Sequence, residues 1–394
     1  MTGAQVNGTE VNGAQVNGAR AHTAGPGAAQ LPRAAQTFTA AQTLTAQQAV
    51  ELAVVERSGF VESRHLGAAV LMDPDGTVVC RLGAVEAPVF VRSALKPLQA
   101  VASLRAGARV EGASAALATA SHRSEQRHID TVEAMLASAG LDESALRCPA
   151  SPPAHGATRF ARREAGHELS RLHFNCSGKH AAFLMAAVAG GHTTEDYLAP
   201  DHPVQREVAR VVEEFAGAPS AAVGTDGCGA PVHALPLTGL ARAIGRFARG
   251  ESPETRTLMD GVLAHPWGIQ GEGRSNTVVI ERLGIFAKGG AEGVLVLATP
   301  EGWSLALKCL DGSDRPAELA GLNLLAAAGA VDPQAAAEAL VAVVPAVTGG
   351  SGEGGATVRA GAVHPGAGLV EALDVLGAKP LGAKPLGVPG GWAR

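Results

Sequence analysis

Ser93 and Lys96 stand three residues apart in the stretch Arg92-Ser93-Ala94-Leu95-Lys96-Pro97. Positions i and i+3 share one face of a helix, so the lysine amine can reach the serine hydroxyl and remove its proton. A serine hydroxyl needs such a neighbouring base, and a lysine serves as one when burial or a second cation lowers its pKa. The same spacing also arises by chance at an ordinary helix start followed by a surface lysine. The spacing alone therefore favours this simpler interpretation.

A second polar motif surrounds Ser121, in the run Ala120-Ser121-His122-Arg123-Ser124-Glu125. Taken alone, the run is typical of a helix start, with Ser121 or Ser124 at the N-cap and Glu125 near the first turn. As part of an active site, it would supply a second hydroxyl group.

A second lysine, Lys288, is followed by two glycines in the run Phe286-Ala287-Lys288-Gly289-Gly290, on or beside an expected strand. Glycines at such a position let a ligand approach the backbone, although a basic strand end with a flexible turn is the simpler interpretation. Together with Ser-x-x-Lys, the run is similar to the Lys-x-Gly element of penicillin-recognising serine enzymes. The chain has no Ser-Asp-Asn and no Lys-Thr-Gly, so it departs from the β-lactamase pattern.

Two cysteines, Cys176 and Cys228, lie among small, polar, turn-forming residues. Two thiolates with a nearby nitrogen or carboxylate would suit Zn²⁺. The spacing is not the Cys-x-x-Cys of a zinc ribbon, so spacing alone favours two unrelated loop cysteines. Cys80, Cys148 and Cys309 lie in or beside expected strands and helices and are predicted to be small buried hydrophobes.

The ends of the 394-residue chain differ in composition from the rest. Residues 1–45 are rich in Gly, Ala, Gln, Asn and Thr, and we expect a disordered tail there because the segment can bury little apolar surface. Residues 376–394 repeat Lys-Pro-Leu-Gly, and we expect a flexible tail. The remaining segment, 46–375, is long enough for one large domain or two small ones, and we expect a single catalytic domain.

The charge and the cysteine content exclude several classes of protein. The formal net charge is −5, without a basic stripe carrying aromatic residues, so a nucleic-acid partner is not expected. No apolar run approaches the length of a membrane span, and the N-terminus has no apolar core of a secretory signal. Five sparse cysteines do not form a disulfide framework, so we expect a cytoplasmic protein.

The expected elements give an α+β domain. Hairpins are predicted over 67–82 and 293–308, and helices over 95–105, 125–139, 180–189, 203–215, 315–328 and 333–343. We expect the two hairpins to pair into one antiparallel sheet that is flanked by the helices. Since proline is tolerated only in a first helical turn, Pro97 places Ser93 at a helix N-terminus, where backbone N–H groups favour negative charge.

Six stretches, in one order over about residues 54–310, resemble one family. It is the asparaginase II family of rhizobial-type, serine-dependent L-asparaginases. The stretches are residues 61–65, 92–97, 120–122, 175–180, 201–205 and 224–228. The chain departs from the family in its two tails, in Arg123 and in the Gly-rich stretch 348–355.

The resemblance implies hydrolysis of L-asparagine to L-aspartate and ammonia, on a fold similar to the serine β-lactamases and serine-dependent glutaminases. It implies two Ser–Lys tandems, with Ser93 the nucleophile. It also implies a zinc ion that aids substrate binding more than bond cleavage, with Arg92, Asp226 and His180 near the substrate. The tandems would be Ser93 with Lys96 and Ser121 with Lys288, and the zinc ligands Cys176, Lys179 and Cys228.

Two alternatives stay open at the level of sequence. One is a glutaminase or a penicillin-recognising serine hydrolase, although the missing Ser-Asp-Asn argues against the latter. The other is a zinc-dependent ligand-binding protein without catalysis, against which the two intact Ser–Lys tandems argue. The expected partner is the small-molecule substrate L-asparagine, with no nucleic acid and no membrane, and the sequence leaves open whether the chain forms a homodimer.

Overall fold

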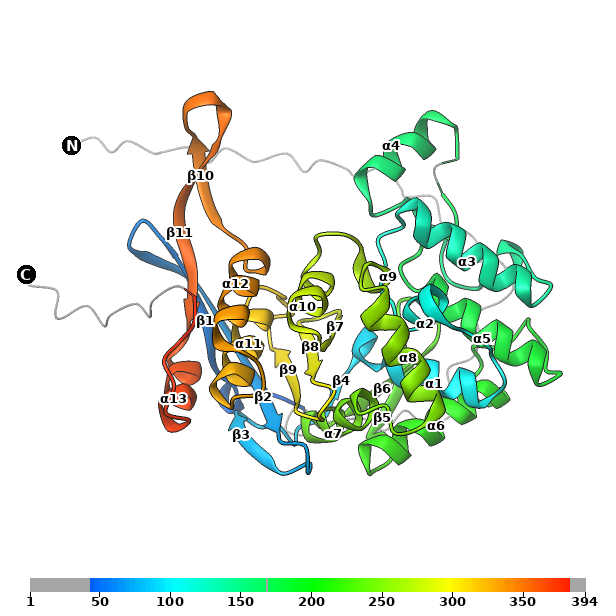
Figure 1. Ribbon diagram of the computed structural model, residues 1–394, viewed down its shortest axis with the longest axis horizontal. Helices are drawn as coiled ribbons and strands as arrows, with labels where there is room; N and C mark the ends of the chain where they lie inside the picture. Colours follow the sequence, from blue (N-terminus) through cyan, green and yellow to red (C-terminus); the bar gives the residue numbers. More distant parts are fainter. Residues whose placement is uncertain (1–42, 168, 383–394) are drawn as a thin grey trace, which may run out of the picture. The chain divides into compact units, whose positions relative to one another are not determined.

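An antiparallel sheet of eight strands runs through the residues that the structure, a computed structural model, describes (Figure 1). These residues are 43–167 and 169–382, and they belong to one unit of the chain, Ala35–Arg394. The sheet has the order β10-β11-β1-β2-β9-β8-β7, and β3 also pairs with β2. The strands are β1 (Val50–Arg57), β2 (Phe60–Met72), β3 (Val78–Leu82), β7 (Phe286–Gly290), β8 (Val294–Ala298), β9 (Ser304–Cys309), β10 (Val347–Ser351) and β11 (Thr357–Pro365).

Both predicted hairpins are present, as β2–β3 and β8–β9, and they join each other through the pairing of β2 with β9. In that pairing Gly67 lies opposite Cys309 and Met72 opposite Ser304. The α+β class with an antiparallel sheet flanked by helices is therefore confirmed. The sequence did not predict β1, β10 and β11, which extend the sheet beyond β2.

Helices cover both faces of the central strands. On one face Leu295, Leu297 and Leu305 pack against Gly321 of α11 (Ala317–Ala327), where a β-carbon would lie only 2.8 Å from the Leu297 Cδ1 atom. On the other face α7 (Leu237–Ala248) contacts β2, β8 and β9. Side chains alternate along a strand, so strands covered on both faces carry continuous apolar runs, as β8 does.

Most of the remaining helices pack together beside the sheet (Figure 1). Each of the six predicted helices is present, with ends that differ by a few residues from the expected ones. Besides α7 and α11, the described α-helices are α1 (Lys96–Arg105), α2 (Gly112–Ala118), α3 (Gln126–Ser138), α4 (Gly156–Glu164), α5 (Ser177–Ala189), α6 (Pro203–Ala216), α8 (Pro253–Ala264), α9 (Trp267–Gln270), α10 (Ser275–Leu283), α12 (Pro333–Val343) and α13 (Ala367–Val375), and short 3-10 helices lie at Ala46–Gln48, Arg92–Leu95, Glu143–Ala145 and Glu353–Gly355. The six predicted helices are α1, α3, α5, α6, α11 and α12. Among the described helices, none is long and apolar enough to cross a membrane.

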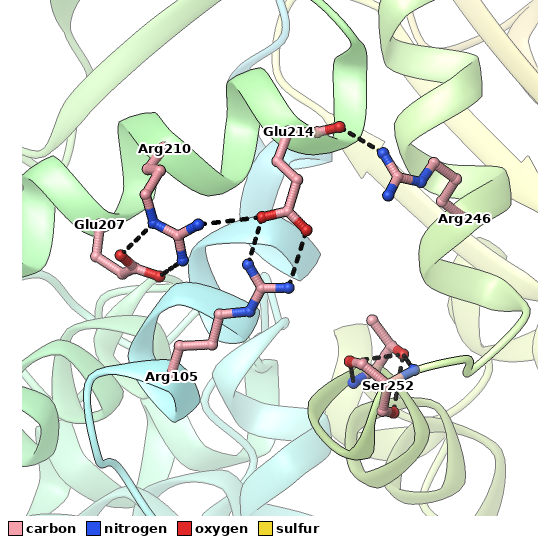
Figure 2. A network of polar contacts seen from close by, with 7 residues as sticks. Arg105, Glu207, Arg210, Glu214, Arg246 and Ser252 are labelled. Atoms are coloured by element: carbon pink, nitrogen blue, oxygen red, sulfur yellow. Dashed lines mark hydrogen bonds and ion pairs between the residues drawn. The ribbon is translucent and has the colours of Figure 1, made fainter.

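Charged side chains tie three of these helices together, as Figure 2 shows. Arg105 of α1 donates two hydrogen bonds to the Glu214 carboxylate of α6, at 2.6 and 3.1 Å. Arg210 bonds to Glu207 and Glu214 along α6, and Arg246 of α7 donates to the Glu214 carbonyl. The network fixes α1, which carries Lys96, against α6 and α7.

A small sheet of three strands, in the order β4-β6-β5, brings two of the polar motifs together. Its strands are β4 (Val89–Phe90), β5 (Ala222–Thr225) and β6 (Pro231–Leu235). The chain leaves β4 directly into the Ser93 motif, and it leaves β5 directly into the turn with Asp226 and Cys228. Because both strands flank β6, residues more than 130 positions apart become neighbours, as the 134-residue separation of Arg92 and Asp226 shows.

The predicted domain boundaries at residues 45 and 375 stay predictions. Most of the predicted N-terminal tail and residues 383–394 lie outside the described residues. The first residues after α13 contact the domain, since the Leu381 N–H donates to the Asn323 Oδ1 atom of α11 at 2.6 Å.

Candidate active site

Ser93 lies where β4 turns into a helix. Arg92 begins the 3-10 helix Arg92–Leu95, which runs directly into α1, and its φ of 48° is a left-handed conformation that is unfavourable for a residue with a side chain. The Val91 N–H donates to the His233 carbonyl at 3.1 Å and anchors the turn on β6. Such strain persists where surrounding structure enforces it, and it is common next to functional groups. Pro97 is in the first turn of α1, as predicted.

Ser121 lies on a loop that is held by hydrogen bonds at both sides. Its N–H donates to the Ile269 carbonyl of α9 at 2.9 Å, and the His122 N–H donates to the Asn175 carbonyl at 3.2 Å. Neither Ser121 nor Ser124 is the N-cap of α3, which is Glu125. The simpler helix-cap interpretation of this serine is therefore wrong, and its hydroxyl is available for another contact.

Lys96 contacts the Ser121 hydroxyl. Its Nζ atom donates to the Ser121 Oγ at 2.9 Å, to the Ala120 carbonyl, and to the Asn175 carbonyl at 3.5 Å. The lysine is 1% exposed, and these acceptors satisfy the N–H groups of its buried amine. No hydrogen bond joins Lys96 to Ser93 among the described contacts, so the observed hydroxyl–amine contact links Lys96 with the second serine of the predicted tandems.

Ser93, Ser121 and Lys288 line one cavity of about 270 Å³. Lys96 is not among the described residues that line the cavity, but it contacts one of them, Ser121. A larger hollow of about 680 Å³ has no lysine among the described residues that line it. The polar residues of the smaller cavity are Ser93, Ser121, His122, Arg123, Asn175, Gln270, Ser275, Asn276, Lys288, Asp314 and Glu318.

Both lysines are in surroundings that disfavour their charge. Burial, together with the nearby charge of Lys96, holds the pKa of Lys288 well below its usual value. Burial also lowers the pKa of Lys96, which the Cys176 thiol opposes and Lys179 reinforces. A lysine is a base only when it is neutral, so these shifts give both amines the property that proton transfer requires.

The three predicted zinc ligands lie together. Lys179 Nζ donates to the Cys228 Sγ at 3.1 Å, and the neighbouring Cys228 side chain, together with the charges of Lys96 and Lys179, holds the pKa of the Cys176 thiol well below its usual value. Burial acts to lower the pKa of Lys179, but the two cysteines outweigh it and raise the pKa. One nitrogen and two sulfurs form a donor set that fits Zn²⁺, provided that a bound ion displaces the lysine proton.

Two of the predicted substrate-binding residues lie at this thiol cluster as an ion pair. Arg92 Nε donates to the Asp226 Oδ1 at 2.8 Å, and the other Asp226 oxygen accepts a hydrogen bond from Cys228 at 3.6 Å. Burial opposes ionisation of Asp226, but Lys179 and Arg92 outweigh it and lower the pKa. The pair is therefore charged at neutral pH.

His180, the third of these residues, is fully buried, and its Nδ1 contacts the Tyr197 hydroxyl at 2.6 Å. Arg92, Asp226 and His180 are not among the described residues that line the 270 Å³ cavity. Their assignment to the substrate stays a prediction.

A further group with the geometry of a metal site is present among the described residues. The ligand atoms of His65, Cys309 and Asp311 lie within 4.8 Å of one another. Cys309 is buried as predicted, but its thiol donates to the Asp311 Oδ1 at 2.9 Å and is not a purely apolar group. The sequence does not reveal this group, because His65 and Asp311 are 246 residues apart and meet only through the β2–β9 pairing.

Two acidic residues that the sequence did not single out, Asp314 and Glu318, also line the cavity. Burial raises the pKa of both carboxyl groups. Asp314 lies between β9 and α11, and Glu318 lies in the first turn of α11, in a stretch whose spacing carries no catalytic pattern.

Comparison with known proteins gives one match over most of the chain. The L-asparaginase II family model matches residues 53–360. No curated protein matches the chain. Among solved structures, the crystal structure of Mglu in its native form has a TM-score of 0.36 at 13% identity, covering 63% of this chain and 60% of that one. Mglu in its glutamate form gives 0.29 at 15% identity, covering 63% and 57%.

The chain thus spans about three fifths of the length of these Mglu chains. The family model, in contrast, begins inside β1 and ends inside β11, so it includes every strand of the large sheet, with β1 and β11 included in part. It also includes the Ser93, Ser121 and Lys288 motifs and the thiol cluster. The chain belongs to the L-asparaginase II family.

Proposed function

We propose that this protein is an L-asparagine amidohydrolase that releases L-aspartate and ammonia through a serine nucleophile activated by lysine. The observation that carries the proposal is the meeting of Ser93, Ser121 and Lys288 in one cavity, with Lys96 in contact with Ser121. Membership of the family supports the choice of L-asparagine as substrate.

Ser93 is the proposed nucleophile because of its place at the helix start. Its Oγ attacks the side-chain amide carbon of asparagine, which forms a new C–O bond and places negative charge on the amide oxygen. The Ser93 N–H donates to no described residue, so it is available as a donor to that oxygen. Departure of ammonia leaves an ester on Ser93, and water hydrolyses the ester to release L-aspartate.

Lys96 is the proposed base. It takes the proton of the Ser93 hydroxyl through Ser121, whose Oγ is within hydrogen-bond reach of Lys96 and shares the cavity with Ser93. The same route returns the proton to the departing ammonia. Lys288 supports this role because a proton on either lysine disfavours one on the other.

Zinc at Cys176, Lys179 and Cys228 is the proposed cofactor, and it would supply positive charge for substrate binding. The protein's own groups at that side are Asp226, which attracts the substrate ammonium, and Arg92, which holds Asp226 in place. Both roles position the substrate and break no bond.

The size of the cavity favours a small substrate over a β-lactam antibiotic. Its volume of about 270 Å³ lies just below the range of about 300–1,000 Å³ that is typical of pockets for drug-sized ligands. A single amino acid suits such a space.

The experiment that tests the proposal measures ammonia release by the full-length protein from L-asparagine and L-glutamine, and hydrolysis of the chromogenic cephalosporin nitrocefin. The expected result is turnover of asparagine, with little turnover of the other two. Faster turnover of glutamine or of nitrocefin would show that asparagine is not the preferred substrate. Zinc binding without any turnover would support a ligand-binding protein without catalysis.

A further inference from the structure

His65, Cys309 and Asp311 form a polar cluster that the proposed reaction does not use. The His65 Nδ1 lies 2.8 Å from one Asp311 carboxylate oxygen, and the Cys309 thiol donates to the other at 2.9 Å. The carboxylate therefore bridges an imidazole and a thiol. The three ligand atoms already lie within 4.8 Å of one another, close enough to reach a single ion.

The large sheet holds the cluster in place. His65 belongs to β2 and Cys309 ends β9, and in their pairing Cys309 lies opposite Gly67. The pairing continues one step past β9, because the Leu310 N–H donates to the Leu66 carbonyl at 2.7 Å. The backbone thus fixes the distance between His65 and the turn after β9, whether or not the cluster holds a ligand.

The cluster leaves one buried polar atom without a partner. His65 is 5% exposed, and its Nε2 makes no hydrogen bond. The nitrogen that faces the carboxylate is Nδ1, so Nδ1 would be the ligand of an ion held with Asp311 and Cys309, and Nε2 lies on the other side of the ring. The Asp311 side chain, in contrast, is 48% exposed, so an ion can enter from solvent on that side.

We propose that His65, Cys309 and Asp311 bind a zinc ion, at a site separate from the Cys176–Lys179–Cys228 cluster. Imidazole, thiolate and carboxylate are the ligands that Zn²⁺ takes in proteins, whereas Mg²⁺ and Ca²⁺ prefer oxygen alone. Three protein ligands leave a fourth tetrahedral position for water on the exposed side of Asp311.

The ion would hold the turn that leads to the cavity wall. Asp311 also accepts a hydrogen bond from the Ser313 N–H at 2.8 Å, and the Gly312 N–H donates to the Cys309 carbonyl at 3.3 Å. The next residue, Asp314, lines the 270 Å³ cavity. This structural role rests on the proposed function, since it gives the ion an influence on substrate binding, but the site itself does not.

The test is a titration of the metal-free, full-length protein with Co²⁺, because a cobalt–thiolate bond absorbs in the near ultraviolet and reports on each cysteine site. Four proteins are compared: wild type, Cys309→Ser, the double variant Cys176→Ser/Cys228→Ser, and the triple variant with all three changes. The expected result is about two equivalents of thiolate-bound cobalt for wild type, about one for the single and double variants, and none for the triple variant. Wild-type protein with one equivalent that the double variant loses completely would overturn the proposal.

Two further variants keep the result independent of misfolding. Asp311→Asn changes an exposed side chain of nearly the same shape, and it is expected to weaken cobalt binding in the double-variant background by about tenfold or more. Cys80→Ser, which removes a half-buried thiol outside both clusters, should leave both equivalents in place. Unchanged cobalt affinity in Asp311→Asn would contradict the site. The cobalt count does not depend on asparagine turnover, so failure of one proposal is distinguishable from failure of the other.

Discussion

The Lys96 amine lies 2.9 Å from the Ser121 hydroxyl, 25 residues further along the chain. The contact links the first lysine of the predicted tandems to the second serine, while Ser93 and Lys288 line the same cavity as Ser121. Two consequences follow: Ser121 is placed to carry protons between Lys96 and the cavity, and loss of either residue should impair the same step.

Substitution of Lys96 tests its role as the base. We expect Lys96→Met to lower kcat for asparagine by a factor of about 10² to 10⁴, the usual contribution of general base catalysis. Lys96→Arg should not restore the rate, because arginine stays protonated at any working pH. The measurement is steady-state ammonia release, and recovery of activity by the arginine variant would contradict the role.

The lowered pKa of Lys288 predicts how stability depends on pH. The unfolded chain keeps the lysine proton up to the usual pKa of 10.5, whereas the folded protein has released it at lower pH. Between the two pKa values the unfolded state binds more protons, so the free energy of unfolding rises with pH through this range and falls back as the pH is lowered.

We expect the unfolding free energy of Lys288→Met to rise less with pH than that of wild type, since only Lys96 and Lys308 still contribute lowered lysine pKa values, and we expect Lys379→Met, at an exposed lysine, to keep the full rise. The measurement is the unfolding temperature of the three proteins from neutral pH to about pH 10. If the unfolding temperature rises equally with pH in wild type and in Lys288→Met, Lys288 is charged in the folded state.

The thiol cluster should govern substrate binding more than the chemical step. We expect Cys228→Ala to lower the zinc content and to raise KM for asparagine more than it lowers kcat, because the cluster positions the substrate. Cys148→Ala is the matched control, since Cys148 is also buried but bonds to the Arg171 carbonyl. Zinc content and kinetic constants are measured on the same preparations, and equal zinc content in the two variants would contradict the assignment.

Gly290 packs against the turn that carries Ser93. A β-carbon at Gly290 would lie 3.0 Å from the Val91 carbonyl oxygen and 3.2 Å from the Ala94 nitrogen, which is tighter than ordinary contact. We therefore expect Gly290→Ala to displace the turn and to lower kcat by about tenfold or more, because small displacements of reacting groups are costly. Gly156→Ala is the control, since nothing lies near its added methyl group, and equal kcat values in the two variants would exclude the effect.

The Arg105–Glu214 contact in Figure 2 is expected to be a modest source of stability. Both side chains are partly exposed, so solvent screening limits the pair to about 0.2–1 kcal/mol. A double-mutant cycle with Arg105→Ala and Glu214→Gln, read by denaturant unfolding at neutral pH, measures the coupling. The hydrogen bond from Arg105 lowers the pKa of Glu214, so the contribution should disappear as the pH falls through the lowered value.

Local sequence patterns were sufficient to predict the hairpins of the large sheet and the start of the helix that follows Ser93. The hairpins of β2–β3 and β8–β9 have short turns between apolar runs, and Pro97 alone indicated where the nucleophile's helix begins. The pattern was insufficient for β11, where Gly361 and His364 interrupt the apolar alternation and the pairing partner, β1, is about 300 residues away. Pairing over such a distance is a property of the whole fold.

In the site, too, local motifs were predictable and contacts between distant segments were not. The resemblance to the asparaginase II family implied two tandems, Ser93 with Lys96 and Ser121 with Lys288, and three of these four residues line one cavity, Lys96 being absent from its lining. The Lys96–Ser121 contact was not predictable, because it depends on how the start of α1 faces the loop after α2. The His65–Cys309–Asp311 group depends on the register of β2 against β9, which sequence spacing does not contain.

The most direct test of the central claim is the rate of ammonia release from L-asparagine by Ser93→Ala, with circular dichroism and zinc content matched to wild type. Removal of the nucleophile should lower kcat by a factor of about 10³ or more. A rate within a few fold of wild type would show that another group attacks the amide, and it would contradict the account.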